Sequence, residues 1–229
     1  MDPQTLPAEE LALYTSLRKQ LKLAFEPLKV QDYRLNLLKC TDLEQILEGK
    51  DPLKDVSAFP LWIRLWEAAI VLANYFAGQK PQPGTSLLEL GAGLGASGLV
   101  AAAAGYEVTL TDFEERIQQF QRINAAASNL SGVRFEFLDW FKPSDIGQYD
   151  VIAGSEILYR DEFFEPLIHI FKTALRPGGV IVLSHDAGRR NIAPFFELAQ
   201  QDFRISVVKR TLKSLEGDKV ILLARLLRK

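Results

Sequence analysis

The sequence predicts an α/β fold organised around a doubly wound, mostly parallel sheet, and three observations carry this prediction. Short apolar runs rich in Val and Ile alternate with helical patterns between Ser86 and Ser184, as in parallel sheets covered by helices on both faces. The first of these runs ends in three glycines at alternate positions. The chain closes with two apolar runs that are too close together for a helix to connect them.

Residues 1–59 are predicted to form an accessory segment before the main domain. Leucines at helical spacing predict a helix over Leu11–Phe25, and the loosely alternating stretch Leu28–Leu38 fits either one strand or a hairpin. A further helix is expected to begin at Thr41, because threonine is a good N-cap residue and Glu44 follows three positions later. Turn-forming residues then mark the end of the segment: Gly49, Asp51 and Pro52.

Residues 60–229 are predicted to form the main domain. It is expected to open with an amphipathic helix over Trp62–Phe76. Strands are then expected at Ser86–Leu90, Glu107–Thr111, Val133–Leu138, Tyr149–Gly154 and Val180–Ser184. Helices are expected at Ser97–Ala104, Glu114–Ala127 and Phe163–Leu175.

The end of the chain departs from this alternation. Phe203–Arg210 and Lys219–Leu227 are predicted as two strands, and the short stretch between them allows only an antiparallel hairpin. Together with the five preceding strands they make a seven-stranded, Rossmann-like sheet. Dinucleotide-binding domains usually continue with further parallel strands, so the hairpin counts against a nicotinamide-dependent oxidoreductase.

The composition is that of an ordinary globular protein. Of its 229 residues, 48% are hydrophobic and 24% charged, and the formal net charge of −2 gives no reason to expect nucleic acid as the main partner. A single cysteine, Cys40, rules out an internal disulfide framework and a Cys-rich zinc site, and no metal site is predicted. Prolines and acids interrupt the N-terminus, and no apolar run is long enough to span a membrane, so we expect a cytoplasmic protein.

A glycine-rich turn predicts the binding of an adenosine-bearing cofactor. Gly91, Ala92, Gly93 and Gly95 follow the first parallel strand, and the lack of Cβ atoms at the glycines lets a ligand lie against the main chain. Glu89 stands two residues before the first glycine. A glycine-rich turn alone is weak support, but acids at the following strand ends strengthen the prediction.

Polar and aromatic residues follow the next three strands, where ligands of such sheets bind. Asp112, 21 positions after Gly91, is placed to accept hydrogen bonds from a ribose diol. Asp139 and Trp140 are placed to contact an adenine ring, and Ser155 to face the reacting end of the ligand. Each has a plainer alternative, since Asp112 fits a helix cap, Asp139 a turn, and Trp140 core packing.

At these residues the sequence resembles the class I S-adenosylmethionine-dependent methyltransferases, and within them the seven-β-strand protein methyltransferases of methyltransferase family 16. The resemblance covers about residues 60–229. It rests on four stretches and a tryptophan-containing lead-in: Glu89–Gly95, Leu110–Asp112, Leu138–Trp140, Ser155–Tyr159 and Pro60–Trp66. It implies S-adenosylmethionine as cofactor, S-adenosylhomocysteine as product, and Trp66 lying against the cofactor.

The resemblance also implies an acceptor site after the fourth strand, at the element Asp/Glu-x-x-Tyr formed here by Glu156 and Tyr159. The usual acid is Asp, and the lead-in helix has Glu67-Ala68-Ala69 where the flavoprotein-modifying members have Pro-Gly-Gly, which leaves the substrate open. The Asn/Asp-Pro-Pro-Tyr motif of adenine and glutamine methyltransferases is absent from the sequence, so nucleic-acid methylation is a minor alternative.

The favoured hypothesis is methylation of a protein side chain, with lysine preferred to histidine. Glu156 would bind and orient the incoming nitrogen and Tyr159 would wall the channel, whereas the plainer alternatives are a helix cap for Glu156 and packing for Tyr159. His185 is a weaker candidate for substrate binding, and Arg189-Arg190 fits a solvated loop or a surface for an acidic substrate. Other functions left open are a small-molecule N- or O-methyltransferase, an oxidoreductase, and a non-catalytic interaction module.

Overall fold

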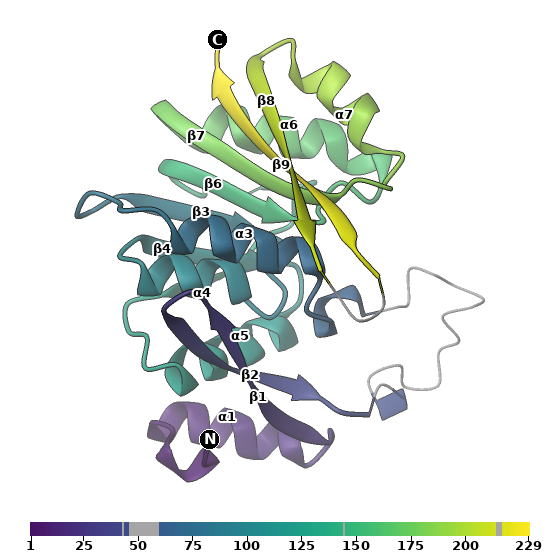
Figure 1. Ribbon diagram of the computed structural model, residues 1–229. Helices are drawn as coiled ribbons and strands as arrows, with labels where there is room; N and C mark the ends of the chain where they lie inside the picture. Colours follow the sequence, from purple (N-terminus) through teal and green to yellow (C-terminus); the bar gives the residue numbers. More distant parts are fainter. Residues whose placement is uncertain (43, 46–59, 144, 214–216) are drawn as a thin grey trace.

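The computed structural model describes residues 1–42, 44–45, 60–143, 145–213 and 217–229, and its centre is a seven-stranded sheet (Figure 1). The strands lie in the order β5-β4-β3-β6-β7-β9-β8. Their bounds are β3 Ser86–Leu90, β4 Glu107–Asp112, β5 Arg134–Phe137, β6 Tyr149–Ser155, β7 Leu175–Asp186, β8 Phe203–Leu212 and β9 Lys219–Arg228. The predicted fold class is therefore confirmed.

Two layers of helices cover the sheet. Helices α3 (Glu67–Ala77), α4 (Ala96–Ala103) and α5 (Glu115–Ala127) lie on one face, and α6 (Phe164–Ala174) and α7 (Ile192–Ala199) on the other (Figure 1). Side chains of successive strand residues enter the two cores alternately, because strands have a period of two: Leu87 packs with α3 and α4, and Leu88 with α6. No helix in the described part of the chain is long and apolar enough to cross a membrane.

The strand order reverses next to β3, which pairs in parallel with both β4 and β6. In open α/β sheets such a switch point leaves a crevice beyond the carboxyl ends of the strands, where ligands bind. At the other side of the sheet, β9 pairs antiparallel with β7 and with β8, so β8 is an edge strand. The predicted terminal hairpin is confirmed.

The N-terminal segment differs from the prediction in where its helix ends. Helix α1 covers Ala8–Arg18, after a short 3₁₀ helix at Pro3–Thr5, so the expected continuation to Phe25 is wrong. Residues 23–30 instead form strand β1 (Leu23–Val30), which pairs antiparallel with β2 (Tyr33–Cys40). Backbone pairing between the two strands outweighs the helical spacing of their leucines, and the hairpin alternative for 28–38 is the right one.

This N-terminal hairpin is anchored on helix α5. The backbone N–H of Leu38 donates to Asn124 Oδ1 at 2.6 Å, and Asn36 Nδ2 donates to the carbonyl of Ala127 at 2.9 Å. The helix expected from Thr41 and the turn at Gly49 and Asp51-Pro52 fall largely on residues 43 and 46–59, outside the described part of the chain. The expected division after residue 59 falls at the same place.

Two helices of the main domain differ from the expectation. The helix expected over Trp62–Phe76 begins later, because a 3₁₀ turn at Leu61–Ile63 is followed by extended backbone, and α3 starts only at Glu67. Helix α7 was not predicted. Its third residue is Pro194, which a first helical turn tolerates because the missing N–H would have no partner there. Helix α6 follows a 3₁₀ turn at Asp161–Phe163, and β7 begins directly after it, well before Val180.

Candidate active site

The glycine loop between β3 and α4 brings the main chain close to the ring of Trp140 and to the backbone of Trp62. Gly91 and Gly93 have φ of 58° and 54°, which L side chains rarely adopt. A Cβ atom at Gly91 would lie 3.2 Å from both Trp140 Cζ2 and Ile157 Cγ2. A Cβ atom at Gly93 would lie 3.4 Å from the carbonyl oxygen of Trp62. Glycine at these two positions therefore lets the loop turn and pack closely against its neighbours.

Glu89 is occupied inside the protein. Its carboxylate accepts hydrogen bonds from the hydroxyl of Ser97 and, at 2.8 Å, from the N–H of Gly98, both in the first turn of α4. A Cβ atom at Gly98 would clash with Leu110 and come within 2.5 Å of Glu89 Oε2, so glycine lets helix and strand approach. Burial raises the pKa of Glu89 to about 7, and the nearby Asp112 charge adds to the shift. A direct contact between Glu89 and a cofactor stays a prediction.

Asp112, at the end of β4, faces the glycine loop. Its two carboxylate oxygens accept hydrogen bonds from the N–H groups of Gly93 and Phe113, each at 2.8 Å. The N–H of Ala92 donates to the carbonyl of Thr111 at 3.0 Å and ties the loop to the same strand. Asp112 does not cap α5, whose N-cap residue is Glu114. Burial raises the pKa of Asp112 to about 6.

Asp139 and Trp140 follow β5 and lie at the same edge of the sheet as the glycine loop and Asp112. Asp139 Oδ1 accepts from the N–H of Phe141 at 2.9 Å, so the residue does form the turn that was its plainer interpretation. The ring of Trp140 packs edge-to-face on the ring of Phe163 at a centroid distance of 5.2 Å. The ring of Tyr159 also packs on Phe163, at 5.0 Å. Burial raises the pKa of the Tyr159 hydroxyl, and the negative charge of Asp112 adds to that rise.

A cofactor of the predicted kind suits these residues. The lone pairs that Asp112 has free can accept from ribose hydroxyl groups, and the glycine loop places its backbone beside the ring of Trp140. Asp112 and Trp140 are brought together with the loop, whereas the carboxylate of Glu89 is turned toward α4. Ser155 ends β6 and is only partly buried.

Glu156 follows Ser155 in a left-handed conformation, with φ of 55°. Its Oε1 accepts from the N–H of Asp186 at 2.7 Å, and its Oε2 accepts from Arg189 Nε at 2.7 Å. The Glu156 side chain is only 9% exposed. Helix begins only at Asp161, so Glu156 is not a helix cap. Arg189 and Arg190 lie in the exposed turn after β7, and the side chain of Arg189, which is 35% exposed, is paired with Glu156.

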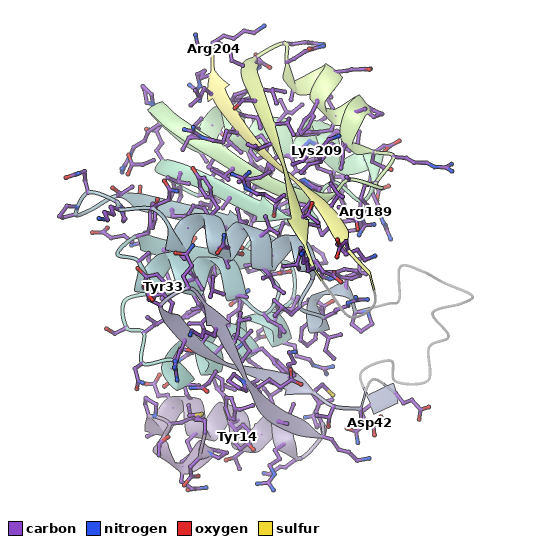
Figure 2. All side chains as sticks on the ribbon, in the orientation of Figure 1. Tyr14, Tyr33, Asp42, Arg189, Arg204 and Lys209 are labelled. Carbon is purple, nitrogen blue, oxygen red and sulfur yellow. The ribbon has the colours of Figure 1, made fainter. Side chains whose placement is uncertain are left out.

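A cavity of about 320 Å³ adjoins this ion pair; its lining includes Arg64, Trp66, Glu156, Asp186, Arg189 and Lys219. The indole N–H of Trp66 donates to the carbonyl of Leu61 at 2.8 Å, which fixes the ring at the start of α3. Two guanidinium groups face that ring, Arg64 at 4.8 Å and Arg189 at 6.0 Å from its centroid. The side chain of Arg189 projects beside the C-terminal hairpin (Figure 2).

Two buried amides of α5, Gln121 and Asn124, were not singled out in the sequence, and they hold the glycine loop through its carbonyl groups. Gln121 Nε2 donates to the carbonyl of Gly93, and Asn124 Nδ2 to the carbonyl of Leu94, each at 2.9 Å. Asn124 also accepts from the N–H of Leu38, so one side chain links the N-terminal hairpin to the loop. The only signal available was that polar residues interrupt the apolar face of an amphipathic helix.

His185 does not join the cavity lining. It is 2% exposed, its Nε2 has no hydrogen-bond partner among the described residues, and burial lowers its pKa to about 3. It is therefore a neutral residue of the interior near neutral pH. The sequence had offered it as a weaker candidate for substrate binding, and its burial removes that interpretation.

The glycine loop, the acid after the second parallel strand and the antiparallel hairpin at the end fit the class of S-adenosylmethionine-dependent methyltransferases, and the comparison with protein families places the chain there. A family model described as lysine methyltransferase matches residues 60–202. The chain belongs to the lysine methyltransferase family.

The chain matches two curated relatives over about two thirds of their length. The chain is 33% identical to protein N-lysine methyltransferase METTL21A of Xenopus tropicalis over 63% of this chain and 69% of that protein. It is 31% identical to EEF1A lysine methyltransferase 3 of Mus musculus, over 64% and 66%. A putative methyltransferase from Streptococcus mutans shares the fold, with a TM-score of 0.63 at 13% identity over 89% of this chain and 55% of that one.

Proposed function

We propose that the protein transfers a methyl group from S-adenosylmethionine to the side-chain nitrogen of a lysine in a protein substrate, and that this lysine enters the cavity beside Glu156. One observation carries the proposal. The guanidinium of Arg189 lies 2.7 Å from the Glu156 carboxylate and 6.0 Å from the centre of the Trp66 ring. A carboxylate and an indole are the groups that recognise a cationic side chain, so the cavity suits an ammonium.

The chain's own residues would bind and align the two reactants. Asp112 would hold the ribose, and Asp139 and Trp140 the adenine, while the glycine loop would let the adenosine lie against the main chain. When bound, S-adenosylmethionine supplies a methyl group activated by its positive sulfonium. Because the chemistry resides in the cofactor, alignment and exclusion of water are what the protein must provide.

Glu156 would orient the acceptor rather than deprotonate it. Loss of a proton from a lysine with pKa about 10.4 costs about 4.6 kcal/mol at pH 7. A carboxylate favours the charged ammonium and so raises that cost, whereas the positive sulfonium, and water exclusion once the substrate covers the cavity, would lower it. We infer that Glu156 takes the incoming ammonium in exchange for Arg189, that the proton leaves through water, and that Tyr159 walls the channel.

Incubation with tritium-labelled S-adenosylmethionine and a protein extract tests the proposal, with the Glu156→Ala variant as the matched control. We expect labelled protein bands that the variant does not produce, and N-methyl-lysine after hydrolysis of those bands. Label in methylhistidine or methylarginine, or only in small molecules, would contradict the proposed acceptor. Absence of any enzyme-dependent label would contradict the activity.

A further inference from the structure

The C-terminal hairpin β8–β9 concentrates positive charge in a chain that is acidic as a whole. Residues 204–229 hold eight of the 27 Lys and Arg but only two of the 29 Asp and Glu, while the whole chain carries a net charge of −2. The remainder of the chain is therefore clearly acidic. Such a segregation of charge points to a partner of opposite sign.

The register of the hairpin assigns four of these cations to one face. Ile221 packs on Ala68 and Val71 of α3, so it marks the face turned toward that helix. Residues opposite each other in a ladder share a face, and successive residues alternate. The cations on this α3-side face are Arg204, Arg210, Lys219 and Arg225. We call this set the basic strip.

Three of the four cations of the basic strip are accessible to solvent. Arg204 and Arg210 on the edge strand β8 are exposed, and so is Arg225 on β9, whereas Lys219 is half-buried. Within the described residues, none of the four forms an ion pair with an Asp or Glu. Exposed Val208 lies among them on the same face. The side chains of Arg204 and Lys209 project from the hairpin in Figure 2.

The basic strip begins at the proposed acceptor cavity. Lys219 and Ile221 of β9 line that cavity, and Arg210 lies directly opposite Ile221 in the ladder. From Arg210 the strip continues for six residues along β8 to Arg204, a distance of about 20 Å at 3.3 Å per residue. An extended peptide of similar length, leading away from a residue held in the cavity, would lie along it.

Protection of an edge strand does not explain this arrangement. Charged side chains on edge strands, lysine above all, prevent pairing with other chains. Two of the four cations, Lys219 and Arg225, lie on β9, which is paired on both sides and needs no such protection. Nor does protection account for a strip that leads to a cavity.

We propose that the basic strip docks an acidic, extended segment of the protein substrate that flanks the acceptor lysine. The proposal rests on the proposed function, because the strip would guide that lysine into the cavity. Carboxylates at alternate positions of the segment would face Arg210, Arg225 and Arg204, and an apolar residue between them would cover Val208. The substrate class is thus a lysine next to acidic sequence.

The test uses a fluorescent, lysine-free peptide with glutamate at alternate positions, and the same peptide with glutamine in their place. Binding is followed by fluorescence anisotropy. The variant combines Arg204→Gln, Arg210→Gln and Arg225→Gln, none of which lines the cavity. Lys209→Gln is the matched control, because Lys209 is exposed on the same strand but belongs to the opposite face. Unchanged thermal unfolding verifies that each variant is folded.

We expect the glutamate peptide to bind more tightly than the glutamine peptide, and the triple variant to lose about tenfold in affinity, since each exposed ion pair contributes a few-fold. Lys209→Gln should bind as the wild type does. Added salt should weaken binding to the wild type and have little effect on the triple variant. When a lysine is added to the peptide so that it can be methylated, the triple variant should have a higher KM for the peptide than the wild type and the same kcat.

Equal binding of the two peptides, including no binding of either, would overturn the proposal, as would equal loss in the triple and Lys209→Gln variants. A single-stranded oligouridylate is the competing probe. If it binds more tightly than the glutamate peptide and the triple variant abolishes that binding, the strip is a nucleic-acid surface and the proposal is wrong. Because the binding peptide contains no lysine, failure of the proposed methyl transfer would leave these binding results unchanged.

Discussion

The two sides of the candidate site are built in different ways. The glycine-loop region, made of residues 89–98 and Asp112, consists of backbone, the buried carboxylate of Glu89 and the partly buried carboxylate of Asp112 on the neighbouring strand. The cavity region is made of side chains from distant segments, with Trp66 before α3, Glu156 after β6, and Arg189 after β7. The first is held by hydrogen bonds to N–H groups, and the second by an ion pair and ring contacts.

This difference separates what a whole class of enzymes shares from what one member uses. Backbone geometry tolerates many side chains, so a common cofactor can be held in the same way on many sequences. Side chains from separate loops change independently, so they can adapt to different acceptors. We therefore expect substitutions in the two regions to change different measured quantities.

The largest effect is expected in the cavity region. Glu156→Ala should lower kcat for methyl transfer by roughly a hundredfold or more, because misplacing a reacting atom by about 1 Å costs that much. Its dissociation constant for S-adenosylmethionine, measured by calorimetry, should stay within about twofold of the wild type, and the same is expected of Tyr159→Phe. Glu162→Ala, which removes an exposed acid nearby, is the control. Parallel loss of affinity and activity in Glu156→Ala would make Glu156 a structural residue.

A substitution in the glycine-loop region should instead weaken the binding of the cofactor. Asp112→Ala should weaken S-adenosylmethionine binding by about 1.5–3 kcal/mol, the range for hydrogen bonds to a charged group. Glu114→Ala removes a neighbouring charge without touching the loop and controls for general electrostatics. An unchanged dissociation constant for Asp112→Ala would mean that the ribose binds elsewhere.

The pH dependence of cofactor affinity is a second test of the role of Asp112. Burial raises the pKa of Asp112 to about 6, and hydrogen bonds from ribose hydroxyls favour the ionised carboxylate. Affinity should be constant above about pH 6 and fall by up to about tenfold per unit below it, because binding must then release a proton. Asp112→Asn should remove this dependence. A wild-type profile that stays flat through pH 5 would contradict the assignment.

His185 should affect stability alone, although it is next to the cavity residue Asp186 in the sequence. Its pKa of about 3 lies below the ordinary value of 6.5, so on acidification the unfolded state takes up the proton first. Below about pH 6.5 this should lower the free energy of unfolding by up to about 1.4 kcal/mol per pH unit relative to His185→Leu. Urea unfolding of both proteins at several pH values measures the difference. If the free energy of unfolding has the same pH dependence in both, the predicted effect of His185 is wrong.

The sequence predicted the glycine-loop region better than the cavity region for a physical reason. Parallel strands end at one edge, so residues that follow them, such as Asp112 and Trp140, can be placed together without knowing the tertiary structure. Arg189 reaches Glu156 only because the loop after β7 folds back across 33 positions of sequence, which no local pattern encodes. Glu89 was placed correctly along the chain, but the direction of its side chain depends on how closely Gly98 lets α4 approach.

The same reason explains the errors in the fold. Strands β3, β4 and β6 were predicted closely because each is a short apolar run bounded by turns or helices. Residues 23–25 have helical spacing but lie in β1, where pairing with β2 decides their conformation. The extended backbone before Trp66 depends on the hydrogen bond from its indole to Leu61, again a contact that periodicity does not reveal.

A crystal structure of the protein with S-adenosylhomocysteine tests the central claim, that the two regions hold opposite ends of one ligand, most directly. We expect ribose hydroxyl groups within about 2.6–3.2 Å of the Asp112 carboxylate. The sulfur should point toward the cavity, with Trp66 and Glu156 at its mouth. A ribose away from Asp112, or a sulfur directed away from Glu156, would contradict the account.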